Sequence, residues 1–224
     1  MQVRAPRSPL RTTLLAALLL ASGAAGAMSI GNVRSVSAQG EHAWLLRTDN
    51  GGVMRIEVVA ADIVRVQAGR DGRLTGAGDK ATPIVLPQPA TGAQARLEED
   101  SQELRVRTDA LVLHVQRAPL RLRLERLDQG RAVALWQELQ PLDLDQNRSV
   151  QVLSSQPDEG FYGGGQQNGR YQFKGRELEI SYSGGWEDGD RPSPAPMLLS
   201  DRGWGMVRNT WRDGDYDLRQ PDQA

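Results

Sequence analysis

Apolar and polar residues alternate with a period of two along most of the chain from Ser29 onward. Successive side chains of a β-strand point to opposite faces, so this alternation indicates strands with one face in a core and one in water. Clusters of Gly, Pro, Asn and Asp separate the alternating tracts, and no helical period persists. We therefore predict the all-β class and an antiparallel two-sheet β-sandwich around one large core. The clearest predicted strands are residues 53–59, 62–67, 103–107, 111–115, 120–124 and 177–182.

The charged and reactive residues exclude several classes of function. With 27 Lys and Arg against 28 Asp and Glu, the chain has no basic excess to neutralise a phosphate backbone, so nucleic acid is not an expected partner. There is no cysteine, which excludes disulfides, thiol nucleophiles and Cys-type zinc sites. The two histidines, His42 and His114, stand apart in sequence, and we predict neither a metal site nor a cofactor. Catalysis by such a chain would have to use carboxylates.

The first 27 residues have the pattern of a secretory signal peptide. Three arginines, Arg4, Arg7 and Arg11, precede the apolar run 14–21, and small residues follow up to Ala27. The run is too short to span a bilayer comfortably. We therefore predict that residues 1–27 are cleaved and that residues 28–224 form an exported domain, periplasmic or extracellular, with no membrane association after cleavage. A retained N-terminal anchor is the alternative.

Residues 159–169 form a glycine-rich segment that contains three consecutive glycines at 163–165. Consecutive glycines let a backbone pass very close to another chain segment or to a ligand. A phosphate loop is excluded, because neither Gly-Lys-Ser/Thr nor a helix follows. The segment also carries side-chain amides, among them Gln166 and Asn168.

A second loop, residues 183–196, follows a predicted strand around residues 171–175. It is rich in Gly and Pro and contains Trp186 flanked by carboxylates, including Asp188. Trp beside Asp, Glu, Gln and Asn is typical of sugar recognition, because the aromatic face packs on the C–H side of a sugar ring while polar groups bind the hydroxyls. The alternative is a tryptophan that plugs the end of the sandwich beneath a polar hairpin.

Several motifs in the C-terminal third resemble those of a known family. The succession Phe-Tyr-Gly-Gly-Gly-Gln at 161–166, Lys-Gly at 174–175, Pro-x-Pro at 194–196, Arg-Gly-Trp-Gly at 202–205 and Asn-Thr at 209–210 resembles the N-terminal β-sandwich of glycoside hydrolase family 31. The tighter pattern Gly-Gly-Gly-x-Gln-Asn-Gly, Trp-x-Asp-Gly and Ser-Pro-x-Pro is similar to members that act on α-linked N-acetylgalactosamine. The motifs cover residues 159–212, and upstream the likeness rests on the strand pattern.

The resemblance implies a galactose-mutarotase-like supersandwich belonging to an exported, retaining α-glycosidase. In that family a loop corresponding to residues 184–196 leans over the mouth of a (β/α)8 barrel, so Trp186 and Asp188 are the expected substrate-binding residues, with Gln166 and Asn168 as further candidates. Both catalytic carboxylates sit on the barrel, so no residue of this chain is expected to be catalytic. We expect the chain to be an N-terminal fragment that is inactive alone, with the barrel and an α-linked carbohydrate as partners.

Two other functions fit the same residues. The chain could be a stand-alone carbohydrate-binding module that uses Trp186, or a purely structural sandwich whose glycine-rich turns only close the fold. Whether the chain is itself an enzyme stays open on the sequence.

Overall fold

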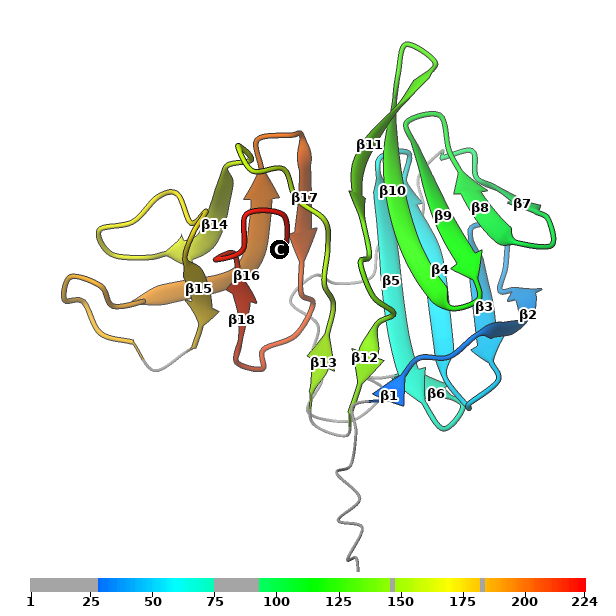
Figure 1. Cartoon of the computed structure of the whole chain (residues 1–224), viewed down its shortest axis with the longest axis horizontal. Helices are drawn as coiled ribbons and strands as arrows, with labels where there is room; N and C mark the ends of the chain where they lie inside the picture. The colour runs from blue at the N-terminus through cyan, green and yellow to red at the C-terminus, as the bar shows by residue number, and fades with distance from the viewer. Residues whose placement is uncertain (1–27, 75–92, 146–147, 182–183) are drawn as a thin grey trace, which may run out of the picture.

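The computed structural model describes residues 28–74, 93–145, 148–181 and 184–224. Every regular element of these residues is a β-strand, and the strand pairs are antiparallel, as the alternation predicted (Figure 1). The all-β fold class is therefore confirmed. The predicted signal peptide, residues 1–27, lies outside the described residues. Within the described part, no helix is long and apolar enough to cross a bilayer.

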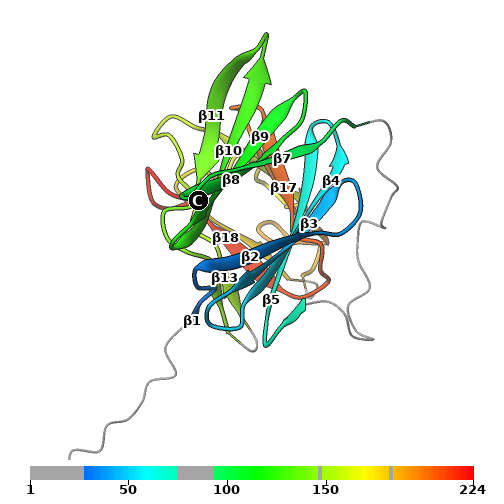
Figure 2. The same cartoon turned by 90° about the vertical axis from the view of Figure 1, so that its right-hand side faces the viewer.

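Two five-stranded sheets face each other in the N-terminal sandwich, residues 33–137 (Figure 2). The first sheet has the order β2-β3-β4-β5-β6 and contains β2 (Val33–Ala38), β3 (Ala43–Thr48), β4 (Val53–Ala60), β5 (Ile63–Arg70) and β6 (Arg73–Leu74). The second has the order β11-β10-β9-β8-β7 and contains β7 (Arg96–Glu99), β8 (Glu103–Arg107), β9 (Leu111–Arg117), β10 (Leu120–Asp128) and β11 (Arg131–Gln137). A small sheet of β1 (Met28–Ser29), β12 (Asp143–Leu144) and β13 (Ser149–Val150) lies at one end.

The period-two pattern sorts side chains between the core and the outer face of the second sheet. In β10, Leu120 and Leu122 are buried in the sandwich core, while Arg121 and Arg123 point outward. The core cluster takes its buried residues from both sheets, including Met54 and Ile56 of β4 and Val106 of β8. The predicted strands at 103–107 and 120–124 are confirmed, because each alternating tract forms a strand of this sheet.

A second unit, the C-terminal lobe, comprises residues 153–224. It contains one sheet of β14 (Phe161–Gln166), β16 (Ser193–Ser200) and β17 (Trp204–Val207), and one of β15 (Glu177–Ile180) and β18 (Gly214–Asp217). These sheets enclose a separate hydrophobic cluster built around Phe161, Phe173 and Leu178. The expectation of one large core is therefore wrong: the lobe strands pair among themselves instead of extending the two sandwich sheets, so they enclose a cluster of their own.

Backbone pairing and one shared side chain join the sandwich to the lobe. Just beyond β11, Glu138 forms a bridge with Leu153, and Leu153 in turn exchanges two hydrogen bonds with Ala224, at 2.8 and 2.9 Å. Trp136 of β11 packs against both hydrophobic clusters. Isolated bridges and a shared tryptophan therefore connect the end of β11 to the lobe.

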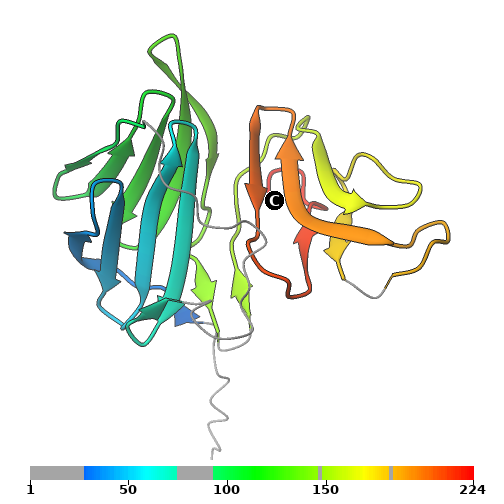
Figure 3. The same ribbon diagram turned by 180° about the vertical axis from the view of Figure 1, so that it is seen from behind.

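The strand expected around residues 171–175 is absent. Residues 171–176 form a turn in which Phe173 is buried in the lobe core and its N–H donates to the carbonyl oxygen of Phe161 at 2.8 Å. Gly175 has a φ of +80°, which is incompatible with an extended strand. Seen from behind, the segment after β14 and the loop before β16 both project from the end of the lobe that lies away from the sandwich (Figure 3).

Candidate functional site

The three consecutive glycines bring β14 into very close contact with β16. Gly163, Gly164 and Gly165 have φ values of +121°, +73° and +72°, and the strand pairing shifts register between the first and the third. A Cβ atom on Gly163 would lie 2.3 Å from the carbonyl oxygen of Met197, and one on Gly165 would lie 2.3 Å from that of Ser193. The close approach is therefore to a neighbouring strand, which accounts for the glycines by packing alone.

A buried carboxylate organises the polar core next to this motif. Glu159 is 1% exposed, and its Oε1 accepts hydrogen bonds from Ser200 Oγ and from Trp204 Nε1, the latter at 2.9 Å. Its Oε2 accepts a hydrogen bond from the Gln156 N–H at 2.9 Å. The Trp204 ring meets Phe161 edge to face, with centroids 6.0 Å apart. Several residues of the family-like motifs thus hold the lobe together, and Glu159, which sequence reasoning did not select, lies at their centre.

Lys174 connects the same region to the C-terminal residues. Its Nζ donates hydrogen bonds to Ser155 Oγ and to the Pro221 carbonyl oxygen, both at 2.8 Å, and lies 5.3 Å from the centroid of the Phe161 ring. Burial lowers the pKa of Lys174, against the opposing effect of the nearby Glu159 carboxylate. Lys174 therefore has a structural role in the lobe.

Trp186 and Asp188 lie on the described part of the second loop, residues 184–192. The Trp186 side chain is 78% exposed and belongs to neither hydrophobic cluster, and Asp188 is also exposed. A turn closes the tip, with the Asp190 N–H donating to the Glu187 carbonyl oxygen at 3.0 Å. The loop therefore presents an indole and carboxylates to solvent, and the indole does not plug the sandwich.

Asn168 fixes the base of this loop. Its backbone N–H donates to the carbonyl oxygen of Asp190 at 3.0 Å, and its side-chain Nδ2 donates to the backbone carbonyl oxygen of Glu187 at 2.8 Å. The structure thus brings Asn168 together with the loop of Trp186 and Asp188, in a positioning role. Gln166 is exposed at the end of β14, opposite Ser193. That any of these residues binds sugar remains a prediction.

A polar cleft of about 160 Å³ lies beside the loop. Gly189 of the loop lines it, as does Arg170 of the turn 167–173, which follows β14. Glu179 accepts a hydrogen bond from Arg191 Nη2 at 3.2 Å. The Nε atom of Arg191 is buried and has no hydrogen-bond partner among the described residues. This cleft was not predicted, because its residues come from separate segments.

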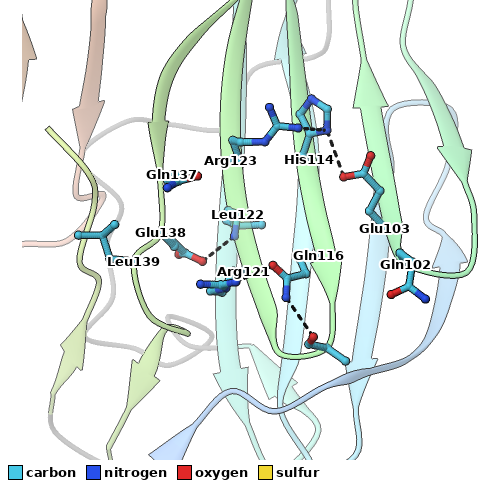
Figure 4. A pocket seen from close by; sticks show the side chains of 11 residues that line it. Gln102, Glu103, His114, Gln116, Arg121, Leu122, Arg123, Gln137, Glu138 and Leu139 are labelled. Carbon is cyan, nitrogen blue, oxygen red and sulfur yellow. Dashed lines mark hydrogen bonds and ion pairs between the residues drawn. The ribbon is translucent and has the colours of Figure 1, made fainter. Parts of the chain in front are cut away.

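A larger hollow, of about 400 Å³, lies on the outer face of the second sheet (Figure 4). There His114 Nε2 lies 3.0 Å from Glu125 Oε2, while its Nδ1 lies 3.0 Å from Arg123 Nη2 and 3.3 Å from Glu103 Oε2. Arg123 also pairs with Glu125, and Arg105 pairs with Glu103 at 2.8 Å. These side chains contact one another across three strands, which indicates a structural network.

Glu138 lines the same hollow and is 2% exposed. Its Oε2 accepts a hydrogen bond from the Leu122 N–H, and its Oε1 accepts one from Gln151 Nε2, both at 2.7 Å. Burial raises the pKa of this carboxyl. The described residues contain no group of His, Asp and Glu side chains placed to hold a metal ion.

Comparison with known proteins identifies the relatives of this domain. Residues 53–217 match the family model of the glycosyl hydrolase 31 N-terminal galactose mutarotase-like domain. No curated protein matches the chain. Among solved structures, the Flavobacterium johnsoniae GH31 dextranase is similar with a TM-score of 0.74 and 16% identity, over 88% of this chain and 24% of the dextranase chain.

Two further enzymes show the same likeness. The GH31 α-xylosidase from a soil metagenome has a TM-score of 0.63 and 19% identity, over 84% of this chain and 30% of its own. The cycloalternan-forming enzyme from Listeria monocytogenes has a TM-score of 0.61 and 17% identity, over 79% of this chain and 17% of its own. At such identities the likeness is one of fold, and the chain spans less than a third of each of the three enzymes. Because the family model matches well over half of the residues, the chain belongs to the family of glycosyl hydrolase 31 N-terminal galactose mutarotase-like domains.

Proposed function

We propose that this chain is the substrate-loop domain of an exported, retaining α-glycosidase and that its 184–192 loop contacts the sugar. The observation that carries the proposal is the indole of Trp186, which is 78% exposed on a loop whose base Asn168 holds through two hydrogen bonds. A fixed, exposed aromatic face is suited to the C–H side of a sugar ring. Family membership supports the assignment, and the similar dextranase was crystallised with isomaltotriose and with glucose.

The residues of the loop take different roles in this proposal. Trp186 stacks on the sugar, and the exposed carboxylate of Asp188 accepts hydrogen bonds from hydroxyl groups. Asn168 positions the loop, and Gln166 at the end of β14 is a further hydrogen-bonding candidate. α-Linked N-acetylgalactosamine is the proposed sugar, on the motif similarity alone.

We further propose that the barrel of the same enzyme supplies the chemistry. Retaining hydrolysis uses a nucleophile and an acid/base, two carboxyl groups about 5–5.5 Å apart. Glu187 and Asp188 are exposed neighbours on one loop and do not form an enclosed pair of that kind. The chain alone therefore should not hydrolyse aryl α-glycosides above background, and turnover abolished by Asp188→Asn would refute this part of the proposal.

A stand-alone carbohydrate-binding module is the second candidate, because the exposure of Trp186 favours it equally. The gene sequence beyond codon 224 separates the two: a barrel with two strand-end aspartates supports the glycosidase, and its absence supports the module. A purely structural sandwich is less favoured, because it gives no reason for an indole in solvent.

Sugar binding can be tested through the five tryptophan indole N–H signals in NMR spectra. The variant Trp186→Ala assigns one signal by removing it. On titration with N-acetylgalactosamine, glucose or isomaltotriose at millimolar concentration, we expect this signal to shift and that of Trp211, which is 54% exposed on another loop, to stay in place. If no indole signal moves with any of these sugars, the proposed sugar contact is wrong.

A further inference from the structure

A second exposed aromatic ring lies on the turn beside the loop of Trp186. Tyr171 is 86% exposed, and it and Trp186 are the two most exposed large hydrophobic residues of the described chain. Single exposed aromatic residues are common on protein surfaces. These two, however, lie on segments that Asn168 joins by two hydrogen bonds, the turn 167–173 and the loop 184–192. Both rings are therefore carried on one connected structure.

Residues of both segments line the polar cleft. Arg170, which immediately precedes Tyr171, lines it from the turn, and Gly189 lines it from the loop of Trp186. Its volume of about 160 Å³ is well below the roughly 300–1,000 Å³ of pockets that enclose a small ligand. A ligand would therefore lie across the mouth of the cleft and direct polar groups into it.

The chemistry of the cleft favours a neutral, polyhydroxyl ligand. Its charged lining residues are two arginines and two glutamates. Glu179 pairs with Arg191 at 3.2 Å, and the two glutamates balance the two arginines in charge, so the lining has no excess charge that would demand an anion. Hydroxyl groups both donate and accept, so they can pair with the guanidinium donors and the carboxylate acceptors of this lining.

We propose that the turn 167–173 and the loop 184–192 form one surface that binds at least two neighbouring units of a neutral oligosaccharide. Tyr171 is the second aromatic platform beside Trp186, and Arg170 provides hydrogen bonds to hydroxyl groups between them. This inference rests on the proposed function and extends it, because a single ring stacked on Trp186 would not need Tyr171 or the cleft.

The test compares a monosaccharide with trisaccharides on the purified chain. Dissociation constants for glucose, isomaltotriose and maltotriose are measured from indole chemical shifts for wild type, Tyr171→Ala and Arg170→Ala. The matched control is Val207→Ala, an exposed residue of β17 in the same lobe. Thermal midpoints of all variants are recorded, and we expect them to remain at the wild-type value because these side chains are exposed.

For Tyr171→Ala we expect trisaccharide affinity to fall by about tenfold, with glucose affinity unchanged within twofold. Arg170→Ala should also lower the affinity for the trisaccharides, and Val207→Ala should leave the affinity for every saccharide unchanged. If trisaccharide binding depends on Trp186 but not on Tyr171 or Arg170, the two-unit surface is wrong while the proposed function stands. If neither these saccharides nor N-acetylgalactosamine shifts the Trp186 signal, both are wrong.

Discussion

Replacement of Glu159 by alanine should strongly destabilise the C-terminal lobe. The side chain is 1% exposed and accepts hydrogen bonds from Ser200 Oγ, Trp204 Nε1 and the Gln156 N–H. Ser200 and Trp204 are themselves buried, so the variant leaves two buried donors without an acceptor, whereas Gln156 is exposed and can bind water. At about 1–3 kcal/mol for each unsatisfied buried donor, the free energy of unfolding should fall by roughly 2–6 kcal/mol.

Urea denaturation followed by tryptophan fluorescence measures this loss. With a slope of about 2 kcal/mol per molar urea, the midpoint should fall by roughly 1–3 M. Glu159→Gln keeps one acceptor oxygen but turns an NH2 group toward a donor, so its loss should be smaller than that of the alanine variant. Glu187→Gln removes an exposed carboxylate and is the matched control, expected within about 0.5 kcal/mol of wild type.

A double-mutant cycle identifies the interaction responsible. Trp204→Phe removes the indole donor, so in the Glu159→Ala background it should cost less than in wild type, with a coupling of about 1–3 kcal/mol. A midpoint for Glu159→Ala within experimental error of that for Glu187→Gln, or a coupling near zero, would refute the role assigned to this carboxylate.

Three further predictions concern the lobe and the hollow. Gly165 and Gly169 share a φ of +72°, but only at Gly165 would a Cβ meet a facing carbonyl oxygen, at 2.3 Å. Alanine at Gly169 should therefore lower the free energy of unfolding by about 1–2 kcal/mol, and alanine at Gly165 should lower it clearly more. Equal losses in denaturation experiments would contradict the packing argument. Asn168→Ala should speed amide hydrogen exchange at residues 186–190 while β10 exchanges as in wild type, and unchanged exchange in the loop would exclude its anchoring role. Burial raises the pKa of the Glu138 carboxyl above 4.5. The stabilising contribution of this carboxyl is therefore complete below pH 4.5 and is lost as pH rises through the folded-state pKa. Between pH 4.5 and 7.5 wild type should lose stability relative to Glu138→Gln, and a constant difference in unfolding free energy would contradict this sign.

Five strands of the sandwich, β4, β5, β8, β9 and β10, were predictable because each carries its own signal. The alternating leucines and arginines of residues 120–124 specify which face of β10 is buried, whatever its neighbours are. The division into two hydrophobic clusters was not predictable in this way. It depends on which strands pair, and short strands such as β15 and β17 can join either sheet on pattern alone.

The polar sites show the same limit. Glu103 and Glu125 lie eleven residues before and after His114, a spacing that suggests nothing until β8 and β10 flank β9. The glycines at 163–165 signalled a close approach, and the sequence left a ligand and a neighbouring strand equally open. Only the pairing of β14 with β16 decides for the strand.

The contrast between Trp204 and Trp186 explains why the loop, rather than the glycine-rich motif, is the better candidate for ligand contact. Trp204 lies in a strand, its ring packs on Phe161, and its N–H donates a hydrogen bond to Glu159, so the indole is buried and paired within the lobe. Trp186 also has acidic neighbours in sequence, yet its ring lies in solvent on a loop that Asn168 holds in place. Folding accounts for the first tryptophan completely. Because burying an aromatic side chain is favourable by itself, a fixed loop that keeps its indole in water leaves that stabilisation available to a bound partner.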